Sequence, residues 1–261
     1  MSRGEFADRV AFVTGAGTGI GRATAEALAS RGAKVAFVTR SDGNRLEAEA
    51  CLGAMGAEVL AIKGDVAVPG DVSAAVEQVR ERFGRIDFVV ANAATVGQGT
   101  NAVDTTLEEW HTLMSVNVSG VFHTIKYTLP LMLERGKGAV VIVGSDNSVM
   151  AWQQMFPYTA TKHALVGMVR SMALDYGPHG IRTNMVCPTT TGTEMVREYV
   201  SRHPDVVDGW LAGVPMRRMA EKSEVAAAIC HLLSDEASFT NGLLYPVDGG
   251  LTAGRFTPAQ S

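Results

Sequence analysis

A tyrosine and a lysine, Tyr158 and Lys162, stand four positions apart in a segment with a helical pattern. Residues at i and i+4 share one face of an α-helix, so the phenol and the ammonium are expected to be neighbours. A phenol can give a proton to a carbonyl oxygen, but its ordinary pKa of ~10 is high for exchange at neutral pH. One ammonium at ~4 Å, at an effective dielectric of ~20, favours the phenolate by about 4 kcal/mol, or ~3 pKa units. The spacing therefore predicts a general acid/base, Tyr158, whose pKa is lowered by Lys162.

Taken alone, such a pair is also common on helix surfaces, so other polar residues matter. Ser145 follows an apolar strand, at the end where ligands bind in α/β sheets, and its hydroxyl is a candidate to hold a substrate oxygen. Ser148 competes for this role, and Ser145 is preferred because it stands at the strand end. Asn117 lies inside a long helical pattern although asparagine is a poor helix former, so it is a further candidate, with a purely structural asparagine as the alternative.

A glycine-rich turn follows the first apolar strand and opens a helix. Such glycines let the backbone approach a pyrophosphate, and the helix N-terminus offers free N–H groups to that anion. The sequence thus predicts a dinucleotide-binding turn. Its residues are Gly15, Gly17, Thr18, Gly19, Ile20 and Gly21.

The second strand ends in Thr39, Arg40 and Ser41, about 20 residues further on, where dinucleotide folds place the residue that reads the ribose. An acidic residue there would bind the 2′-hydroxyl of NAD(H), whereas Arg40 can bind a 2′-phosphate. The hydroxyls of Thr39 and Ser41 can add hydrogen bonds, although Asp42 close by weakens the attraction. NADP(H) is therefore favoured as cofactor, and NAD(H) stays possible.

Strand and helix patterns alternate along the chain, and the strands are nearly continuous runs of apolar residues. That alternation predicts an α/β fold: a Rossmann-type, doubly wound parallel sheet of about seven strands, with helices on both faces. The expected strands are 10–14, 34–39, 58–63, 86–91, 139–143, 181–187 and 243–247. The expected helices are 20–30, 45–55, 71–83, 107–133, 158–176 and 224–233.

One domain, residues 1–261, accommodates all of these elements. Residues at about 188–220 break the alternation and are expected to form a substrate lid beside the carboxyl end of the sheet. An aromatic and methionine lining would suit a medium-sized, partly apolar carbonyl or alcohol, although ordinary packing explains most such residues. The candidate lining residues are Met150, Trp152, Gln153, Met155, Phe156, Met195, Val196, Tyr199, Trp210, Leu211, Val214 and Met216.

Together the motifs resemble the short-chain dehydrogenase/reductases over nearly the whole chain. Thr14–Gly21 matches their TGxxxGxG turn, and Tyr158 to Lys162 matches their YxxxK. The resemblance implies that Ser145, Tyr158, Lys162 and Asn117 form the catalytic set, with Lys162 also on the ribose and Asn117 holding a water. It further implies a set of cofactor contacts at Asp65, Val66, Asn92, Ala93, Pro188, Thr191 and Thr193. Ala94 and Thr189 stand where the family has glycine.

The resemblance also implies a homotetramer, in which the helices at 107–133 and 158–176 pair between subunits and the last strand packs across another axis. The formal charge of −4 gives no support for nucleic acid as a partner. No apolar run reaches membrane-spanning length and the N-terminus lacks a signal-peptide pattern, so no membrane partner is expected and the cytoplasm is the expected location. Three scattered cysteines suggest neither a disulfide framework nor a metal site.

These residues favour an NADP(H)-dependent oxidoreductase that interconverts a carbonyl and a secondary alcohol by hydride transfer. Two alternatives stay open. A dehydratase or epimerase can use the same scaffold, and a non-catalytic cofactor-binding sensor would keep the fold. The sensor is disfavoured because Asn117, Ser145, Tyr158 and Lys162 are all present.

Overall fold

A computed structural model describes residues 4–202 and 204–256 of the chain, so the outermost limits of the expected 1–261 domain lie outside the described residues. Seven parallel strands form one sheet in the order β3-β2-β1-β4-β5-β6-β7. The predicted α/β fold class is confirmed. The strands are β1 (Val10–Thr14), β2 (Lys34–Thr39), β3 (Val59–Lys63), β4 (Phe88–Ala91), β5 (Gly138–Val143), β6 (Ile181–Pro188) and β7 (Leu244–Val247).

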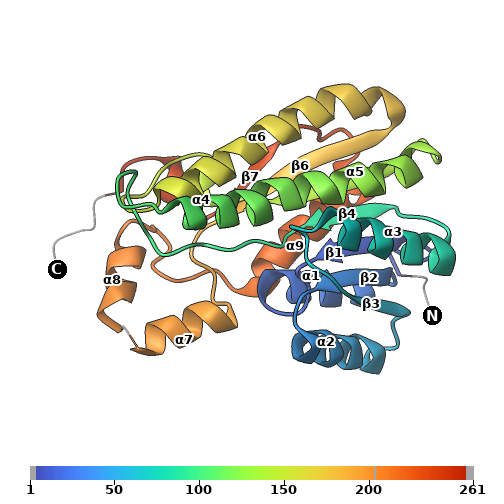
Figure 1. Ribbon diagram of the computed structural model, residues 1–261, viewed down its shortest axis with the longest axis horizontal. Helices are drawn as coiled ribbons and strands as arrows, with labels where there is room; N and C mark the ends of the chain where they lie inside the picture. The colour runs from blue at the N-terminus through green and yellow to red at the C-terminus, as the bar shows by residue number, and fades with distance from the viewer. Residues whose placement is uncertain (1–3, 203, 257–261) are drawn as a thin grey trace.

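Helices cover both faces of the sheet (Figure 1). On one face lie α3 (Pro69–Phe83), α5 (Gly120–Leu133) and α6 (Phe156–Tyr176). On the other lie α1 (Gly19–Ser30), α2 (Asp42–Ala54) and α9 (Lys222–Leu233). The chain leaves β1 toward β2 on one side and returns to β4 on the other, so the strand order reverses beside β1, where α/β sheets bind ligands.

Two apolar layers explain why the strands are almost wholly apolar. Phe12 of β1 packs into the layer under α3, α5 and α6, whereas its neighbour Val13 packs into the layer under α1, α2 and α9. Both side chains are fully buried. Since alternate residues point to opposite faces, a sheet covered on both sides needs an apolar residue at every position.

The segment 107–133 is not the single α-helix that its pattern predicts. It consists of α4 (Leu107–Leu113), a π-helical stretch Met114–Ser119 and α5. The wide turn brings the side-chain amide of Asn117 to the backbone of Thr95 in a neighbouring loop. Such π-helical turns often occur at functional sites. In the sequence, the asparagine inside a helical pattern was the sign that this helix is irregular.

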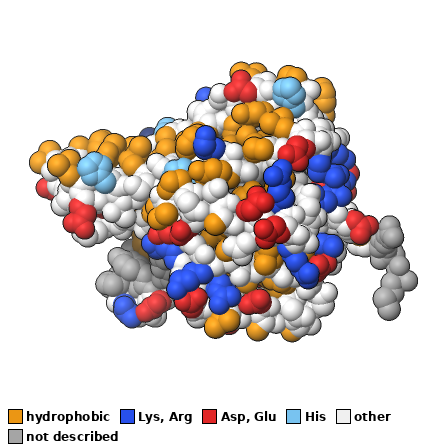
Figure 2. Space-filling view, turned by 45° about the vertical axis from the view of Figure 1, so that its right-hand side comes forward, with side chains coloured by type: hydrophobic (Ala, Val, Ile, Leu, Met, Phe, Trp, Pro, Cys, Tyr) orange, Lys and Arg blue, Asp and Glu red, His pale blue; other side chains and the backbone are white. Residues whose placement is uncertain are grey.

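The region at 188–220 carries two short helices, α7 (Glu194–Arg202) and α8 (Pro204–Ala212). They project from one end of the body, below α4 in Figure 1. In the view of Figure 2, basic and acidic side chains are interspersed and form no single basic patch. Among the described residues, no helix is long and apolar enough to cross a bilayer.

Candidate active site

A cavity of about 650 Å³ opens at the carboxyl edge of the sheet. The ends of β4, β5 and β6 contribute to it, together with the start of α6 and the lid. Eight of the predicted site residues line it: Ile20, Asn92, Ser145, Tyr158, Lys162, Pro188, Thr191 and Thr193. Most of the other predicted residues lie on the adjoining glycine-rich turn or after the ends of β2, β3 and β4. Asn117 lies in the π-helical stretch before α5.

Ser145 stands where β5 ends and a 3₁₀ turn, Asp146–Ser148, begins. Its hydroxyl donates to Asp146 Oδ1 at 2.7 Å and accepts from the backbone N–H of Asn147 at 3.2 Å. Ser148, the competing serine, is buried and its Oγ accepts from the backbone N–H of Ser145 at 3.1 Å. Ser145 therefore faces the cavity, and Ser148 supports the turn from behind.

Tyr158 and Lys162 lie on the first turns of α6, with Lys162 Nζ 5.5 Å from the centre of the Tyr158 ring. Lys162 Nζ donates to the carbonyl of Val143 at 3.0 Å. Burial lowers the pKa of Lys162 to about 8, and the thiol of Cys187 opposes that fall.

Tyr158 itself has a pKa raised to about 12. Burial is the main cause, a hydrogen bond with Ser145 opposes it, and the charge of Asp146 adds to it. This differs from the lowered pKa expected for a Tyr/Lys pair. The sequence pattern gives the spacing of the ammonium, but it contains neither the desolvation of the phenol nor the nearby carboxylate.

Asn117 is buried and fully occupied by hydrogen bonds. The backbone N–H of Thr95 donates to its Oδ1 at 2.8 Å, and its Nδ2 donates to the Thr95 carbonyl at 2.8 Å and to Thr161 Oγ1 at 3.2 Å. Thr161 immediately precedes Lys162 on α6. Asn117 thus ties the loop after β4 to the helix that carries the tyrosine and the lysine.

The glycine-rich turn joins β1 to α1, and a side chain at Gly17 or Gly21 would collide with its neighbours. A Cβ on Gly21 would lie 2.4 Å from Asn92 Nδ2, and one on Gly17 would lie 2.8 Å from Thr39 Oγ1. Asn92 Nδ2 donates to the carbonyls of Thr14 at 3.0 Å and Gly15 at 3.2 Å, which fixes the turn against the end of β4. The backbone of Ala93 joins this contact, because its N–H donates to Thr14 Oγ1 at 3.2 Å.

The N-terminus of α1 already holds an anionic oxygen. The backbone N–H of Gly19 donates to Glu194 Oε2 of the lid at 3.1 Å, and Lys222 pairs with the same carboxylate. Thr18 is the N-cap residue of α1, but its side chain accepts no hydrogen bond from the N–H groups of the first turn. The turn therefore has the geometry and polarity of an anion site.

The predicted ribose-reading residues lie at the carboxyl ends of β2 and β3. Arg40 is well exposed, and Nη1 lies 3.6 Å from Asp65 Oδ2. Asp42 is engaged elsewhere, since Lys63 Nζ donates to it at 2.5 Å. Ser41 caps α2 by accepting from the backbone N–H of Asn44 at 3.3 Å, a structural task that competes with cofactor contact.

Asp65 and Val66, after β3, have local tasks as well. Asp65 Oδ1 accepts from the backbone N–H of Ala67 at 2.9 Å. The Val66 side chain is buried against α5, where a Cβ on Gly120 would come within 2.6 Å of it.

The end of β6 leads through Pro188 into the lid. Thr191 is buried, and its hydroxyl donates to the carbonyl of Thr189 at 2.9 Å. Thr193 lies beside the glycine-rich turn, 3.4 Å from where a Cβ on Gly19 would stand, and its hydroxyl accepts from the backbone N–H of Val196 at 3.3 Å. The lid therefore meets the glycine-rich turn through Thr193.

The predicted pocket lining was partly wrong. Trp152, Gln153, Met155, Val196 and Trp210 line the cavity. Phe156 instead stacks on Trp110, Val214 is buried and Met216 is exposed; Met150 and Leu211 also lie outside the lining. The side chains of Met195 and Tyr199 are outside the described residues.

Sequence reasoning missed the part played by Asp146. It is buried beside Ser145 and accepts a hydrogen bond from it. A carboxylate directly after the strand-end serine was the available signal.

Comparisons with known proteins agree with this geometry. The model of a family described as enoyl-(acyl carrier protein) reductase matches residues 15–252. Levodione reductase of Leifsonia aquatica is 37% identical over 255 residues, covering 95% of this chain and 96% of the relative. A crystal structure of levodione reductase matches with a TM-score of 0.92 at 36% identity, covering 95% of this chain and 99% of that one.

Two further matches bear on substrate and cofactor. Cyclohexanol dehydrogenase of an Acinetobacter species is 34% identical over 252 residues, covering 95% of this chain and 97% of the relative. A crystal structure of NAD⁺-bound xylitol dehydrogenase matches with a TM-score of 0.90 at 30% identity, covering 94% of this chain and 99% of that one.

The chain belongs to the short-chain dehydrogenase/reductase family, as its motifs predicted. The relatives it matches are dehydrogenases and reductases acting on CH–OH groups and carbonyls, so the general class is that of NAD(P)-linked oxidoreductases.

Proposed function

We propose that this protein interconverts a carbonyl and a secondary alcohol by hydride transfer, with NADP(H) as the preferred cofactor and Tyr158 as general acid/base. The observation that carries the proposal is the convergence of Ser145, Tyr158 and Lys162 on one cavity at the carboxyl edge of the sheet. Ser145 follows β5, and the other two lie on the first turns of α6. Tyr158 and Lys162 have pKa values moved far from their ordinary range, as is typical of active sites.

In the reductive direction, the substrate oxygen accepts hydrogen bonds at the position between Ser145 and Tyr158. When bound, the nicotinamide cofactor supplies the hydride to the carbonyl carbon. Tyr158 gives its phenolic proton to the oxygen, and the phenolate then regains a proton from solvent. Oxidation of the alcohol runs the same proton transfer backwards, so it requires the phenolate form of Tyr158.

The residues present fit a nicotinamide dinucleotide. The N–H at the start of α1 already binds the carboxylate of Glu194, so it can bind a pyrophosphate oxygen in its place. Gly17 and Gly21 let the turn pack closely against Thr39 and Asn92, where a Cβ would collide. As the family resemblance implies, Lys162 would hold ribose hydroxyls, and Pro188, Thr191 and Thr193 would hold the nicotinamide end of the cofactor.

The preference for NADP(H) depends on Arg40. Its guanidinium is 69% exposed and its contact with Asp65, at 3.6 Å, is long, so a 2′-phosphate can compete for it. Asp42, the nearest opposing charge in sequence, is neutralised by Lys63 and Arg45.

We expect Arg40→Ala to raise the KM for NADPH about tenfold, the loss of one charge-assisted hydrogen bond, while the KM for NADH stays within about twofold. Steady-state kinetics with both cofactors measure this. Arg80→Ala, which removes an exposed arginine that pairs with Glu134 away from the end of β2, is the matched control. Equal catalytic efficiency with NADH and NADPH in the wild type would refute the preference.

For the substrate we propose a compact secondary alcohol or ketone, including ring compounds. The indoles of Trp152 and Trp210 give the cavity flat apolar walls, and its relatives include a cyclohexanol dehydrogenase. Turnover of NADPH or NADP⁺ with a panel of cyclic and open-chain ketones and alcohols tests both the reaction and the class. Cofactor binding without turnover of any panel member would favour the sensor alternative.

We also propose a homotetramer located in the cytoplasm. The family resemblance implies a tetramer in which α5, α6 and β7 form the contacts between subunits. Each of these elements has an exposed apolar or aromatic side chain: Phe122 of α5, Leu174 of α6 and Tyr245 of β7. Light scattering at micromolar concentration tests the assembly, and a monomer would rule it out.

A further inference from the structure

The carboxylate of Glu194 lies at the position proposed above for the pyrophosphate of the cofactor. Glu194 is the first residue of α7 in the lid, whereas Gly19 is the first residue of α1, at the end of the glycine-rich turn. The backbone N–H of Gly19 donates to Glu194 Oε2 at 3.1 Å. An anion of the protein's own chain therefore binds at the N-terminus of α1, where a helix favours negative charge.

The second oxygen of this carboxylate has a cation beside it. Lys222, the first residue of α9, pairs with Glu194 Oε1. Burial opposes the ionisation of Glu194, but the hydrogen bond from Lys222 outweighs it, so the pKa of the carboxyl lies below its ordinary value. Glu194 is thus charged at neutral pH, and it bridges an N–H of α1 and an ammonium of α9.

The first turn of α7 is held so that this carboxylate faces the glycine-rich turn. The hydroxyl of Thr193 accepts from the backbone N–H of Val196 at 3.3 Å, which caps the start of the helix. Arg197 Nε donates to the carbonyl of Gly192 at 3.0 Å, and its Nη2 pairs with Glu221 at 2.9 Å. These contacts fix the start of α7 against the segment that leads into α9, so the contact with α1 needs little further ordering of the lid.

This carboxylate and a phosphate group exclude each other. The backbone N–H of Gly19 has a single hydrogen to donate. Two anions at one helix N-terminus also repel each other, and the repulsion is strongest at the short distances that hydrogen bonds require. Glu194 must therefore leave the N–H before a pyrophosphate oxygen can take its place.

We propose that Glu194 competes with the pyrophosphate of the nicotinamide cofactor for the N-terminus of α1, an inference that rests on the proposed function because NADP(H) is the ligand. Only molecules in which Glu194 has left Gly19 are competent to bind the cofactor, so the contact lowers the apparent affinity. By linkage, the bound cofactor keeps Glu194 away from the turn, which couples the start of the lid to occupancy of the cofactor site.

The test is stopped-flow binding of NADPH to the purified protein, followed by NADPH fluorescence. Glu194→Ala should lower the Kd about tenfold, as expected where the contact is formed in about nine-tenths of the unbound molecules. The association rate constant should rise about tenfold and the dissociation rate constant should stay within about twofold, because Glu194 acts on the unbound protein. Glu194→Gln keeps the oxygen and its reach but loses the charge, so it should show a smaller gain. Equal rate constants in wild type and Glu194→Ala overturn the proposal.

Glu198→Ala is the matched control. Glu198 is also an exposed acidic residue of α7, and its carboxylate pairs with Arg202 of the same helix. The control therefore removes one carboxylate and one ion pair of α7, as Glu194→Ala does, and both rate constants should stay within about twofold of the wild-type values. If Glu198→Ala speeds association as much as Glu194→Ala, general attraction of an anionic cofactor explains the gain and the proposal fails.

Two further outcomes are decisive. If Glu194→Ala binds more tightly only because NADPH dissociates more slowly, Glu194 repels the bound cofactor instead of competing with it, and the proposal is wrong. A loosened lid would weaken binding, so a gain in affinity separates competition from a merely structural role. The measurement needs no substrate. If the wild type binds neither NADPH nor NADH, the proposed function fails and this inference fails with it, whereas unchanged binding in Glu194→Ala refutes this inference alone.

Discussion

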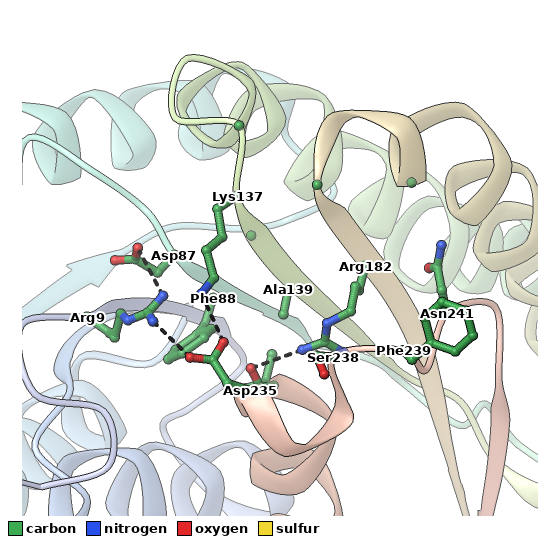
Figure 3. Close-up of a pocket in the computed structure, with 15 residues that line it drawn as sticks. Arg9, Asp87, Phe88, Lys137, Ala139, Arg182, Asp235, Ser238, Phe239 and Asn241 are labelled. Carbon is green, nitrogen blue, oxygen red and sulfur yellow. Dashed lines mark hydrogen bonds and ion pairs between the residues drawn. The ribbon is translucent and has the colours of Figure 1, made fainter.

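The two edges of the sheet carry cavities of nearly equal size and opposite character. At the carboxyl edge the cavity is about 650 Å³, and Tyr158 and Lys162 stand on its wall with pKa values of about 12 and about 8. At the amino edge it is about 610 Å³, and its charged side chains pair with one another (Figure 3). The size of a hollow thus says little about its function. What distinguishes the reactive edge is a phenol and an ammonium side by side on the cavity wall, whereas the charges at the amino edge pair with one another.

The pairing at the amino edge is thorough. Asp235 accepts from Arg9 at 3.2 Å and lies 3.0 Å from Lys137 Nζ (Figure 3). Arg182 donates to the carbonyls of Leu232 and Ser234 at 2.8 and 3.0 Å, where α9 ends. These hydrogen bonds and ion pairs hold the amino ends of the strands against the end of α9, so their role is structural.

The largest expected effect is that of Tyr158→Phe. Removing the acid/base should lower kcat by at least ~100-fold in both directions, since that is what general acid catalysis contributes. Cofactor affinity, followed by NADPH fluorescence, should change little because the ring remains. Phe239→Ser, at the exposed rim of the amino-edge cavity, is the control and should keep wild-type turnover. Equal activity of wild type and Tyr158→Phe on a confirmed substrate would make the mechanism wrong.

A smaller effect is expected from pH. Alcohol oxidation needs the phenolate, and a pKa raised above its ordinary value means that this form is scarce and grows with pH. The oxidation rate at saturating cofactor should therefore rise by up to about tenfold per unit between about pH 6 and 8. Above pH 8 the slope should fall, because Lys162, whose pKa burial lowers to about 8, loses the charge that favours the phenolate.

Carbonyl reduction, which uses the protonated phenol, should not rise over that range. Stopped-flow measurement of the hydride-transfer step in both directions separates this from product release. A flat oxidation profile from pH 6 to 8 would contradict the assignment of Tyr158 as the base.

Features that follow from local sequence pattern were predictable, and features that depend on contacts between distant residues were not. The strands were predictable because a sheet buried on both faces, as at Phe12 and Val13, leaves an apolar run. Ser145, Tyr158 and Lys162 were recognisable because their positions relative to a strand end and a helix face follow from local pattern. The π-helical turn around Asn117 was not predictable in form, because it accompanies a hydrogen bond to Thr95 in another loop, a contact that sequence spacing does not reveal.

Asp146 and the pKa of Tyr158 show a second limit. Two of the donors to the buried carboxylate of Asp146 come from Trp152 and Thr189, which only the folded chain brings together. The raised pKa of Tyr158 results chiefly from burial, and the sequence records spacing but not desolvation. Paired charges at the amino edge, such as Lys137 with Asp235, likewise join residues far apart in the chain.

The smallest expected effect is that of Asp235→Asn, at the amino edge. Its hydrogen bond with Lys137 holds the pKa of Asp235 below the ordinary value, so its stabilising contribution is present above that value and is lost as the pH falls. The side chain is 70% exposed, and exposed ion pairs contribute only about 0–1 kcal/mol. Urea unfolding at pH 7 should therefore show a loss below ~1 kcal/mol that disappears in acid, with kcat and its pH profile unchanged. A changed pH profile in this variant would mean that the two edges are coupled, and the distinction between a reactive and a structural edge would no longer hold.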